Sequence, residues 1–160
     1  MILLISDTHN NENCIKRLAK EYENVKLLAL IHLGDVTDFT ILEPLKILKC
    51  EKYVVKGNND VLDLSSASFL KSIDFDFSNP PYEIFVEDFG HIAIMHEPFF
   101  TEEYIEDSKT KYIFYGHTHV RENKKKNNKR IVNPGALSSV MNFRMSYALV
   151  KKDEVEFKTL

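Results

Sequence analysis

The sequence predicts one α/β domain that spans residues 1–160 and contains a mixed system of β-sheets. Two observations lead to this expectation. In the first half, short apolar runs alternate with segments of helical periodicity, an order typical of parallel strands joined by helices. In the second half, strand-like runs follow one another with polar turns between them, which indicates antiparallel pairing.

The first half contains three short apolar runs that we expect to be buried strands. After the first run, four residues between Ile15 and Tyr22 recur at the spacing of one helix face, which predicts an amphipathic helix. The expected elements are a strand at 2–5, a helix at 11–22, a strand at 27–33, a short helix at 41–48 and a strand at 52–55. This order implies a parallel sheet.

The second half begins with a long, poorly patterned connection at 63–81, which is partly helical in composition. Two strands at 82–86 and 91–95 then form an expected hairpin, a polar helix is expected at 101–108, and another strand at 111–115. Residues 120–133, 145–152 and 154–160 are expected to form antiparallel strands with polar turns.

The composition excludes several classes of protein. The formal net charge of -3 disfavours a dedicated nucleic-acid binder, which usually carries a basic surface. Two cysteines in 160 residues are no disulfide framework and indicate a reducing compartment. The amino terminus has no basic region typical of a signal peptide, and the longest apolar region, 25–33, is interrupted by Lys26 and His32. We therefore expect a cytoplasmic protein that does not bind membranes.

Side chains of the kinds that bind metal ions follow directly after five of the apolar runs. The segments are Ile5-Ser6-Asp7-Thr8-His9, Leu33-Gly34-Asp35, Lys56-Gly57-Asn58-Asn59-Asp60, Met95-His96 and Tyr115-Gly116-His117-Thr118-His119. In open α/β sheets the carboxyl ends of the strands face one crevice, where ligands bind. Residues far apart in the sequence are therefore expected to meet there.

The expected site contains two carboxylates, one amide and four imidazoles. These candidate ligands are Asp7, His9, Asp35, Asn58, His96, His117 and His119. Oxygen and imidazole ligands without thiolate suit manganese, iron, zinc or nickel. Seven ligands are too many for one tetrahedral ion but fit two ions if one carboxylate bridges them. Asp35 is the expected bridge, because Gly34 lets the backbone come close.

Each motif also has a structural interpretation when it is taken alone. An Asp-x-His triplet is common, and a Gly-Asp pair after a strand usually forms a turn or a helix cap. Alternating histidines at a strand end are more specific. His32 lies inside an expected strand and should make a hydrogen bond in the core, whereas His91 begins a hairpin strand and should be exposed.

The order of these motifs resembles the calcineurin-like metallophosphoesterases over about residues 1–150. The motifs that carry the resemblance are Asp7-x-His9, Gly34-Asp35, Gly57-Asn58-x-Asp60, His96, Gly116-His117-x-His119 and Asn133-Pro134-Gly135-Ala136. The small single-domain bacterial and archaeal phosphodiesterases are the most similar branch. The resemblance implies a four-layer αββα sandwich of two mixed sheets flanked by helices. It also implies that Asp7, His9 and His119 hold a first metal, that Asn58, His96 and His117 hold a second, and that Asp35 bridges them.

The resemblance implies a phosphodiesterase with two divalent ions, manganese first and nickel, iron or zinc as alternatives, in which a metal-bridging hydroxide attacks a small phosphorylated substrate. Asp35, Asn58 and His96 are the expected catalytic residues. Asn59 stands where many members have histidine, and an amide cannot serve as a general acid, so we expect a preference for diesters. Asn59 and Arg144 are the expected substrate contacts. Glu97 and Ala136 also depart from the family pattern.

Alternative functions stay open at this point. A phosphomonoesterase is one, and a protein-binding scaffold is another, for which the retromer subunit with this fold is the precedent. The basic run 124–130 is expected to be a solvated hairpin turn with Asn127-Asn128 at the bend, with nucleic-acid binding as its alternative. The oligomeric state, including a homo-oligomer, is not determined by these features.

Overall fold

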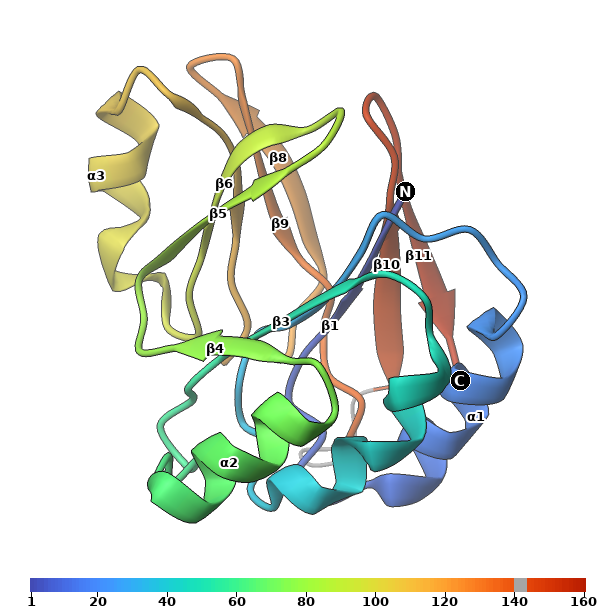
Figure 1. Cartoon of the computed structure of the whole chain (residues 1–160). Coiled ribbons are helices and arrows are strands. Elements are labelled where there is room, and N and C mark those ends of the chain that lie inside the picture. The colour runs from blue at the N-terminus through green and yellow to red at the C-terminus, as the bar shows by residue number, and fades with distance from the viewer. Residues whose placement is uncertain (140–143) are drawn as a thin grey trace.

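The computed structural model describes residues 1–139 and 144–160, and it arranges them in two sheets with helices on both outer sides (Figure 1). The six-stranded sheet has the order β11-β10-β1-β2-β3-β4, and the five-stranded sheet has the order β5-β6-β7-β9-β8. The strands of the first are β1 (Ile2–Ile5), β2 (Ala29–His32), β3 (Glu51–Val55), β4 (Asp76–Ser78), β10 (Ser146–Val150) and β11 (Val155–Thr159). Those of the second are β5 (Tyr82–Val86), β6 (Gly90–Ile94), β7 (Thr110–Phe114), β8 (Glu122–Lys126) and β9 (Lys129–Asn133).

Both sheets are mixed. Strands β1 to β4 are parallel neighbours, while β10 and β11 continue the sheet in antiparallel pairs. In the other sheet, β6, β7 and β9 are parallel, and β5 and β8 are antiparallel edge strands. The parallel strands of each sheet end on the same side, which gathers the loops that follow them.

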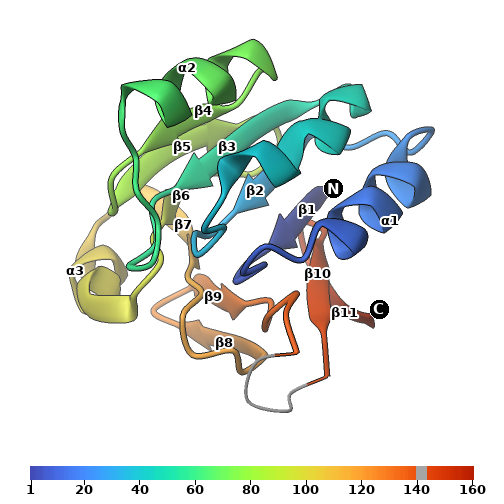
Figure 2. The ribbon, with the colours of Figure 1, turned by 90° about the horizontal axis from the view of Figure 1, so that it is seen from below.

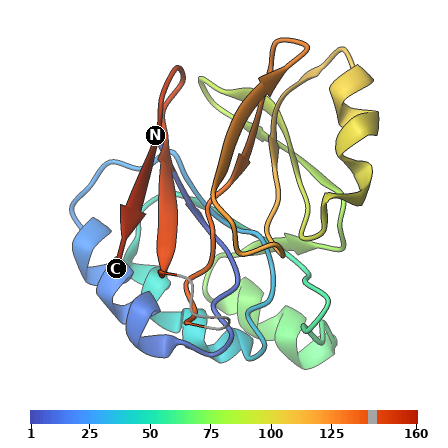
Figure 3. The same ribbon diagram turned by 180° about the vertical axis from the view of Figure 1, so that it is seen from behind.

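Four layers follow from how the apolar residues are divided. On β1, Leu3 and Ile5 belong to a core under the helices, whereas Ile2 and Leu4 face the core between the sheets, because successive side chains of a strand point to opposite faces. The helices over the six-stranded sheet are α1 (Glu12–Tyr22), η1 (Phe39–Ile47) and α2 (Leu64–Ser72), as Figure 2 shows. Helix α3 (Thr101–Glu106), preceded by the short η2 (Pro98–Phe100), covers the other sheet (Figure 3). The predicted αββα sandwich is confirmed.

The short helix expected at 41–48 is present as the 3-10 helix η1, and Pro44 inside it has no N–H to donate. The structure differs from the expected elements in two places. The connection at 63–81 contains α2 and also a strand, β4, whose three residues are too few to show a pattern. The last strands are not all antiparallel, because β9 pairs in parallel with β7.

None of the helices in the part of the chain that the structure describes combines the length and apolarity needed to span a bilayer.

Candidate metal centre

The seven expected ligands come together in the loops that follow β1, β2, β3, β6 and β7. Backbone hydrogen bonds tie these loops across the sheet: the Asp7 N–H donates to the Gly34 carbonyl (3.0 Å), and the His9 N–H donates to the Asp35 carbonyl (3.0 Å). Five of the seven residues have left-handed backbone, with φ of 53° at Asp7, 42° at His9, 55° at Asp35, 65° at His117 and 59° at His119. Residues other than glycine rarely adopt this backbone conformation, because it is strained. Strained backbone of this kind is concentrated at functional sites.

Glycines allow these loops to approach one another. A Cβ at Gly57 would lie 2.3 Å from Oδ1 of Asp35, and a Cβ at Gly116 would lie 2.9 Å from Oδ2 of Asp7. Both distances are shorter than any real Cβ contact. The two glycines therefore leave the space in which the two carboxylates sit.

The three residues expected to form the first group, Asp7, His9 and His119, lie close together. Oδ1 of Asp7 lies 3.2 Å from Nε2 of His119 and 3.9 Å from Nε2 of His9. Asp7 is fully buried, and its other oxygen, Oδ2, accepts hydrogen bonds from the Ser6 hydroxyl and the His117 backbone N–H. Within the described residues, Oδ1 of Asp7 and Nε2 of His9 have no hydrogen-bond partner although both are buried.

The three residues expected to form the second group, Asn58, His96 and His117, also lie close together. Oδ1 of Asn58 lies 2.9 Å from Nε2 of His96 and 3.0 Å from Nδ1 of His117, and those two nitrogens are 3.3 Å apart. Nδ1 of the buried His96 donates to the Leu33 carbonyl at 2.8 Å. This bond holds the ring in the tautomer whose Nε2 lone pair points into the site, as is typical of metal-ligating histidines.

Asp35 lies between the two groups. Its Oδ2 is 3.7 Å from Nε2 of His9 in the first group and 3.4 Å from Nε2 of His96 in the second. Burial disfavours its charge, but the neighbouring His96 ring and the hydrogen bonds from Asn59 outweigh burial and hold the pKa of Asp35 well below its usual range. The carboxylate is therefore ionised, as a metal ligand must be.

The donor atoms meet the requirements of a metal site. The described residues contain two sets of ligands whose donor atoms all lie within 4.8 Å of one another, Asp7 with His9 and His119, and Asp7 with Asp35 and His96. A buried carboxylate oxygen without a partner is costly in a protein, and a cation removes that cost. The unpartnered Asp7 and His9 atoms thus fit a cation bound among them.

Two residues that support the site were not among the expected ligands or substrate contacts. Asp60 is buried and accepts backbone N–H groups of Asp35 (2.9 Å), Thr37 (2.7 Å) and Gly57 (2.8 Å), so it joins two ligand loops. The N-cap of α2 is the nearby Asp63. The only sequence signal for Asp60 was its place in the Gly57-Asn58-x-Asp60 motif.

Asn133 supports the loop that carries His117 and His119. Its Nδ2 donates to the Gly116 carbonyl (2.7 Å) and to the Thr118 hydroxyl (3.0 Å), while its Oδ1 accepts the Gly135 N–H. The Asn-Pro-Gly turn noted in the sequence thus supports the loop of two expected ligands.

The expected substrate contacts lie beside the centre. Asn59 contacts Asp35 rather than open space: its backbone N–H donates to Oδ1 (2.9 Å) and its side-chain amide to Oδ2 (2.7 Å). Arg144 lines a hollow of about 270 Å³ together with Arg121 and His119. A carboxylate oxygen of Glu97 lies 4.0 Å from Nε2 of His117, at the outer side of the centre.

Other expectations about single residues are met. His32 is fully buried, shares a hydrogen bond with the Thr8 hydroxyl (2.9 Å) and accepts the Gly34 N–H (3.1 Å). His91 is exposed.

Fold and site together define a metal-dependent phosphoesterase. A sequence profile of the calcineurin-like phosphoesterase superfamily domain matches residues 1–154, and the chain belongs to this family. The enzyme class expected from the sequence is thereby confirmed.

Individual relatives agree with the family assignment. Phosphodiesterase MJ0936 of Methanocaldococcus jannaschii is 21% identical over an alignment of 166 positions, which spans 98% of this chain and 96% of that protein. The solved structure of an archaeal phosphodiesterase is similar with a TM-score of 0.89 at 21% identity and covers 99% of both chains. Zinc-bound Vps29 from Entamoeba histolytica has the same fold, with a TM-score of 0.66 at 17% identity over 99% of this chain and 97% of that one.

Proposed function

We propose that the chain hydrolyses phosphodiesters with two divalent ions, manganese first, held by the two groups of ligands with Asp35 between them. The observation that supports this most directly is the position of Oδ2 of Asp35, within 3.7 Å of one histidine from each group. When bound, the two ions would supply a water molecule of lowered pKa as nucleophile and positive charge for the phosphoryl oxygens.

Residues of the chain would position the substrate and stabilise the charge that develops on it. Asn58 presents its amide at the open side of the centre, where the side-chain N–H groups can donate to a phosphoryl oxygen as charge develops on it. His96 is held by the Leu33 carbonyl and keeps one face of the centre dry and fixed. His117 is the most exposed of the histidines in the centre, and we place the substrate entrance beside it.

Diesters are favoured by what stands at position 59. An amide does not titrate, and the side-chain amide of Asn59 is already bonded to Asp35. No proton is supplied from this position to a leaving alkoxide, so leaving groups of low pKa react best. Arg144 and Arg121 offer two guanidinium groups in the hollow beside His119, which suits a further anionic group of the substrate.

The test is a screen of metals against substrates. Manganese, nickel, iron and zinc are each added to the metal-free chain, and hydrolysis of an aryl phosphodiester is compared with hydrolysis of the matching monoester. We expect faster diester hydrolysis and a loss of at least about a hundredfold in Asp35→Asn, since the negative charge that both groups share would be removed. Asp88→Asn is the matched control, because Asp88 also has a left-handed backbone (φ 69°) but lies in the β5–β6 turn.

A protein-binding scaffold is the competing function, and the likeness in fold to Vps29 is the observation that favours it. The same screen separates the two. If no divalent ion is bound at equilibrium and no substrate is hydrolysed under any condition, the enzymatic proposal is wrong and the scaffold is supported. If the monoester is the faster substrate, the phosphoesterase class holds but the diester preference does not.

A further inference from the structure

A groove of about 610 Å³ lies at the end of the molecule opposite the metal centre. It is bordered by the amino end of β7, by the β8–β9 hairpin and by the turn between β10 and β11. The metal ligands His117 and His119 follow the carboxyl end of β7, one strand length away. Figure 3 shows the tips of both hairpins together at the top of the molecule, with α1 and α2 at the bottom.

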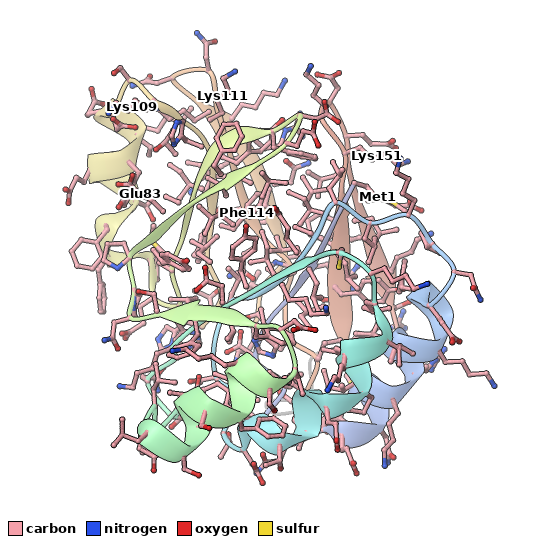
Figure 4. The ribbon with its side chains drawn as sticks, in the orientation of Figure 1. Met1, Glu83, Lys109, Lys111, Phe114 and Lys151 are labelled. Carbon is pink, nitrogen blue, oxygen red and sulfur yellow. The ribbon has the colours of Figure 1, made fainter. Side chains whose placement is uncertain are left out.

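Five basic side chains line this groove, against three acidic ones. The basic residues are Lys111, Lys125, Lys129, Arg130 and Lys152. None of the five forms an ion pair with a carboxylate of the described residues. Figure 4 labels Lys111 at this end of the molecule, well away from the helices over the six-stranded sheet.

Neighbouring lysines on the same strand behave differently. Lys124 pairs with Glu122 (3.0 Å), and Lys126 pairs with Glu102 of α3 (2.7 Å). Lys125 stands between them, so its side chain points to the opposite face of β8. The hairpin therefore divides its charges, with paired lysines on one face and an unpaired one toward the groove.

The groove places like charges opposite each other. Lys125 of β8 is the direct cross-strand partner of Arg130 on β9, and Arg130 is in turn the partner of Tyr112 on β7. Like charges in this position destabilise a sheet. Arg130 is held in place by bonds to neutral oxygens, the Asp153 carbonyl (3.1 Å) and the Asn123 amide (3.2 Å), which leave its charge uncompensated.

Two of the three acidic residues of the groove, Asp107 and Glu106, accept hydrogen bonds from their neighbours. Oδ2 of Asp107 accepts the backbone N–H groups of Thr110 (2.6 Å) and Lys109 (3.0 Å), and a carboxylate oxygen of Glu106 accepts from Asn127 (3.2 Å). The floor is also fixed, because the buried Lys129 ammonium donates to the carbonyls of Asp107 and Thr110. The result is a preformed wall with a basic excess.

We propose that this groove binds a polyphosphate group, with Lys125, Arg130 and Lys152 as donors to its oxygens. Its volume is that of a small-molecule site, and cations supplied by two hairpins match an anion with several adjacent charges. Binding is through phosphate rather than through a base, because Tyr112 is buried and its hydroxyl donates to the Lys152 carbonyl (2.8 Å), which leaves no aromatic face for stacking. The site is separate from the proposed hydrolytic activity.

The experiment measures binding of tripolyphosphate to the full chain by calorimetry and by thermal melting, without divalent ions so that the metal centre does not contribute. Tripolyphosphate should bind saturably and raise the melting temperature. Lys125→Gln should weaken binding roughly tenfold, the loss of one charge-assisted hydrogen bond. It should also raise the melting temperature of the free chain, because it removes the like-charge pair with Arg130.

Lys124→Gln is the matched control: it removes the same charge from the next residue of the strand, on the other face. It should leave tripolyphosphate binding unchanged. Equal weakening by both variants, or no saturable binding, overturns the proposal. ATP should bind within about threefold of tripolyphosphate, since the base finds no stacking partner. Much tighter binding of ATP, or of a single-stranded oligonucleotide in a manner lost in Lys125→Gln, would assign the groove to a nucleotide or nucleic acid instead.

Discussion

Asn59 and Asp60 are adjacent in the sequence but act on different sides of Asp35. Asn59 donates to both carboxylate oxygens of Asp35, while Asp60 accepts its backbone N–H. Asn59 thus stabilises the charge of the carboxylate that is the candidate bridging ligand, and Asp60 fixes the position of its backbone.

Replacing Asn59 by His tests whether the missing acid decides substrate preference. The imidazole can donate a proton near neutral pH, so monoester hydrolysis should rise relative to diester hydrolysis. The measurement is the ratio of kcat/KM for an alkyl phosphomonoester and the corresponding diester. Asn59→Gln, which keeps an amide and introduces no acid, should leave the ratio unchanged. An equal ratio in all three proteins would mean that the leaving-group proton comes from elsewhere.

Asp60→Asn tests the backbone contacts. The variant leaves an NH₂ group where a carboxylate oxygen accepted buried N–H groups, so we expect a loss of about 3 kcal/mol in the free energy of unfolding and weaker metal binding. Urea denaturation and metal titration measure the two effects. Asp63→Asn is the control, since asparagine caps a helix as well as aspartate does and Asp63 caps α2. Similar losses in both variants would contradict the role of Asp60.

At this scale, the sequence alone predicted the seven side chains that the structure brings together, because each follows an apolar run whose end faces the crevice. It did not predict that Asn59 bonds to Asp35, or that Asp60 and Asn133 hold the ligand loops. Those contacts depend on left-handed backbone at residues such as Asp35 and His117, and no local pattern announces that conformation.

The loops at the site approach one another closely because they contain glycines. Gly116 at the site and Gly90 away from it allow a steric effect to be distinguished from a backbone effect. Gly116, after β7, does not have a left-handed backbone conformation, yet a Cβ there would lie 2.1 Å from the Ser6 hydroxyl. Gly90 in the β5–β6 hairpin has φ of 82°, but a Cβ there would meet nothing closer than 3.7 Å.

Gly116→Ala should therefore push the loop after β7 away from β1 and remove most of the hydrolytic activity, with a cost of about 3 kcal/mol in stability. Gly90→Ala should cost about 1 kcal/mol through backbone strain alone and leave activity intact. Steady-state kinetics with urea denaturation of both variants measures the contrast. Full activity in Gly116→Ala would show that the two loops do not need this close approach.

The helices and strands of the first half were predictable because their apolar runs and helical spacing are local. Strand β4 and the parallel pairing of β9 with β7 were not, because a three-residue strand has no pattern and pairing partners are chosen by the whole sheet. The 3-10 form of η1 reflects Pro44, which was visible in the sequence but does not by itself decide between helix types.

At the scale of the whole molecule, His32 links the core to the loop that carries Asp35 of the candidate metal centre. This histidine is fully buried at the end of β2, and burial lowers its pKa to about 4, with Asp60 and Asp7 opposing that shift. Its Nδ1 accepts the Gly34 N–H, so the neutral ring is required directly beside the loop that carries Asp35. Protonation would remove this acceptor and place a charge inside the sheet.

Stability should consequently fall as the pH drops from about 6.5, the pKa of an unperturbed histidine, toward 4. In that range the unfolded chain binds a proton at this position and the folded chain does not, so the free energy of unfolding decreases by about 1.4 kcal/mol per pH unit from His32 alone. Above 6.5 the contribution is constant. In His32→Asn, the side-chain oxygen can still accept the Gly34 N–H, but no proton is bound, so the curve of stability against pH should be flatter by this amount. Urea denaturation of both proteins between pH 4.5 and 7.5, with a chelator present in each, cancels the titration of the other histidines in the difference. Parallel curves would mean that the folded protein accommodates a charged His32, and that its buried hydrogen bonds do not hold the ring neutral.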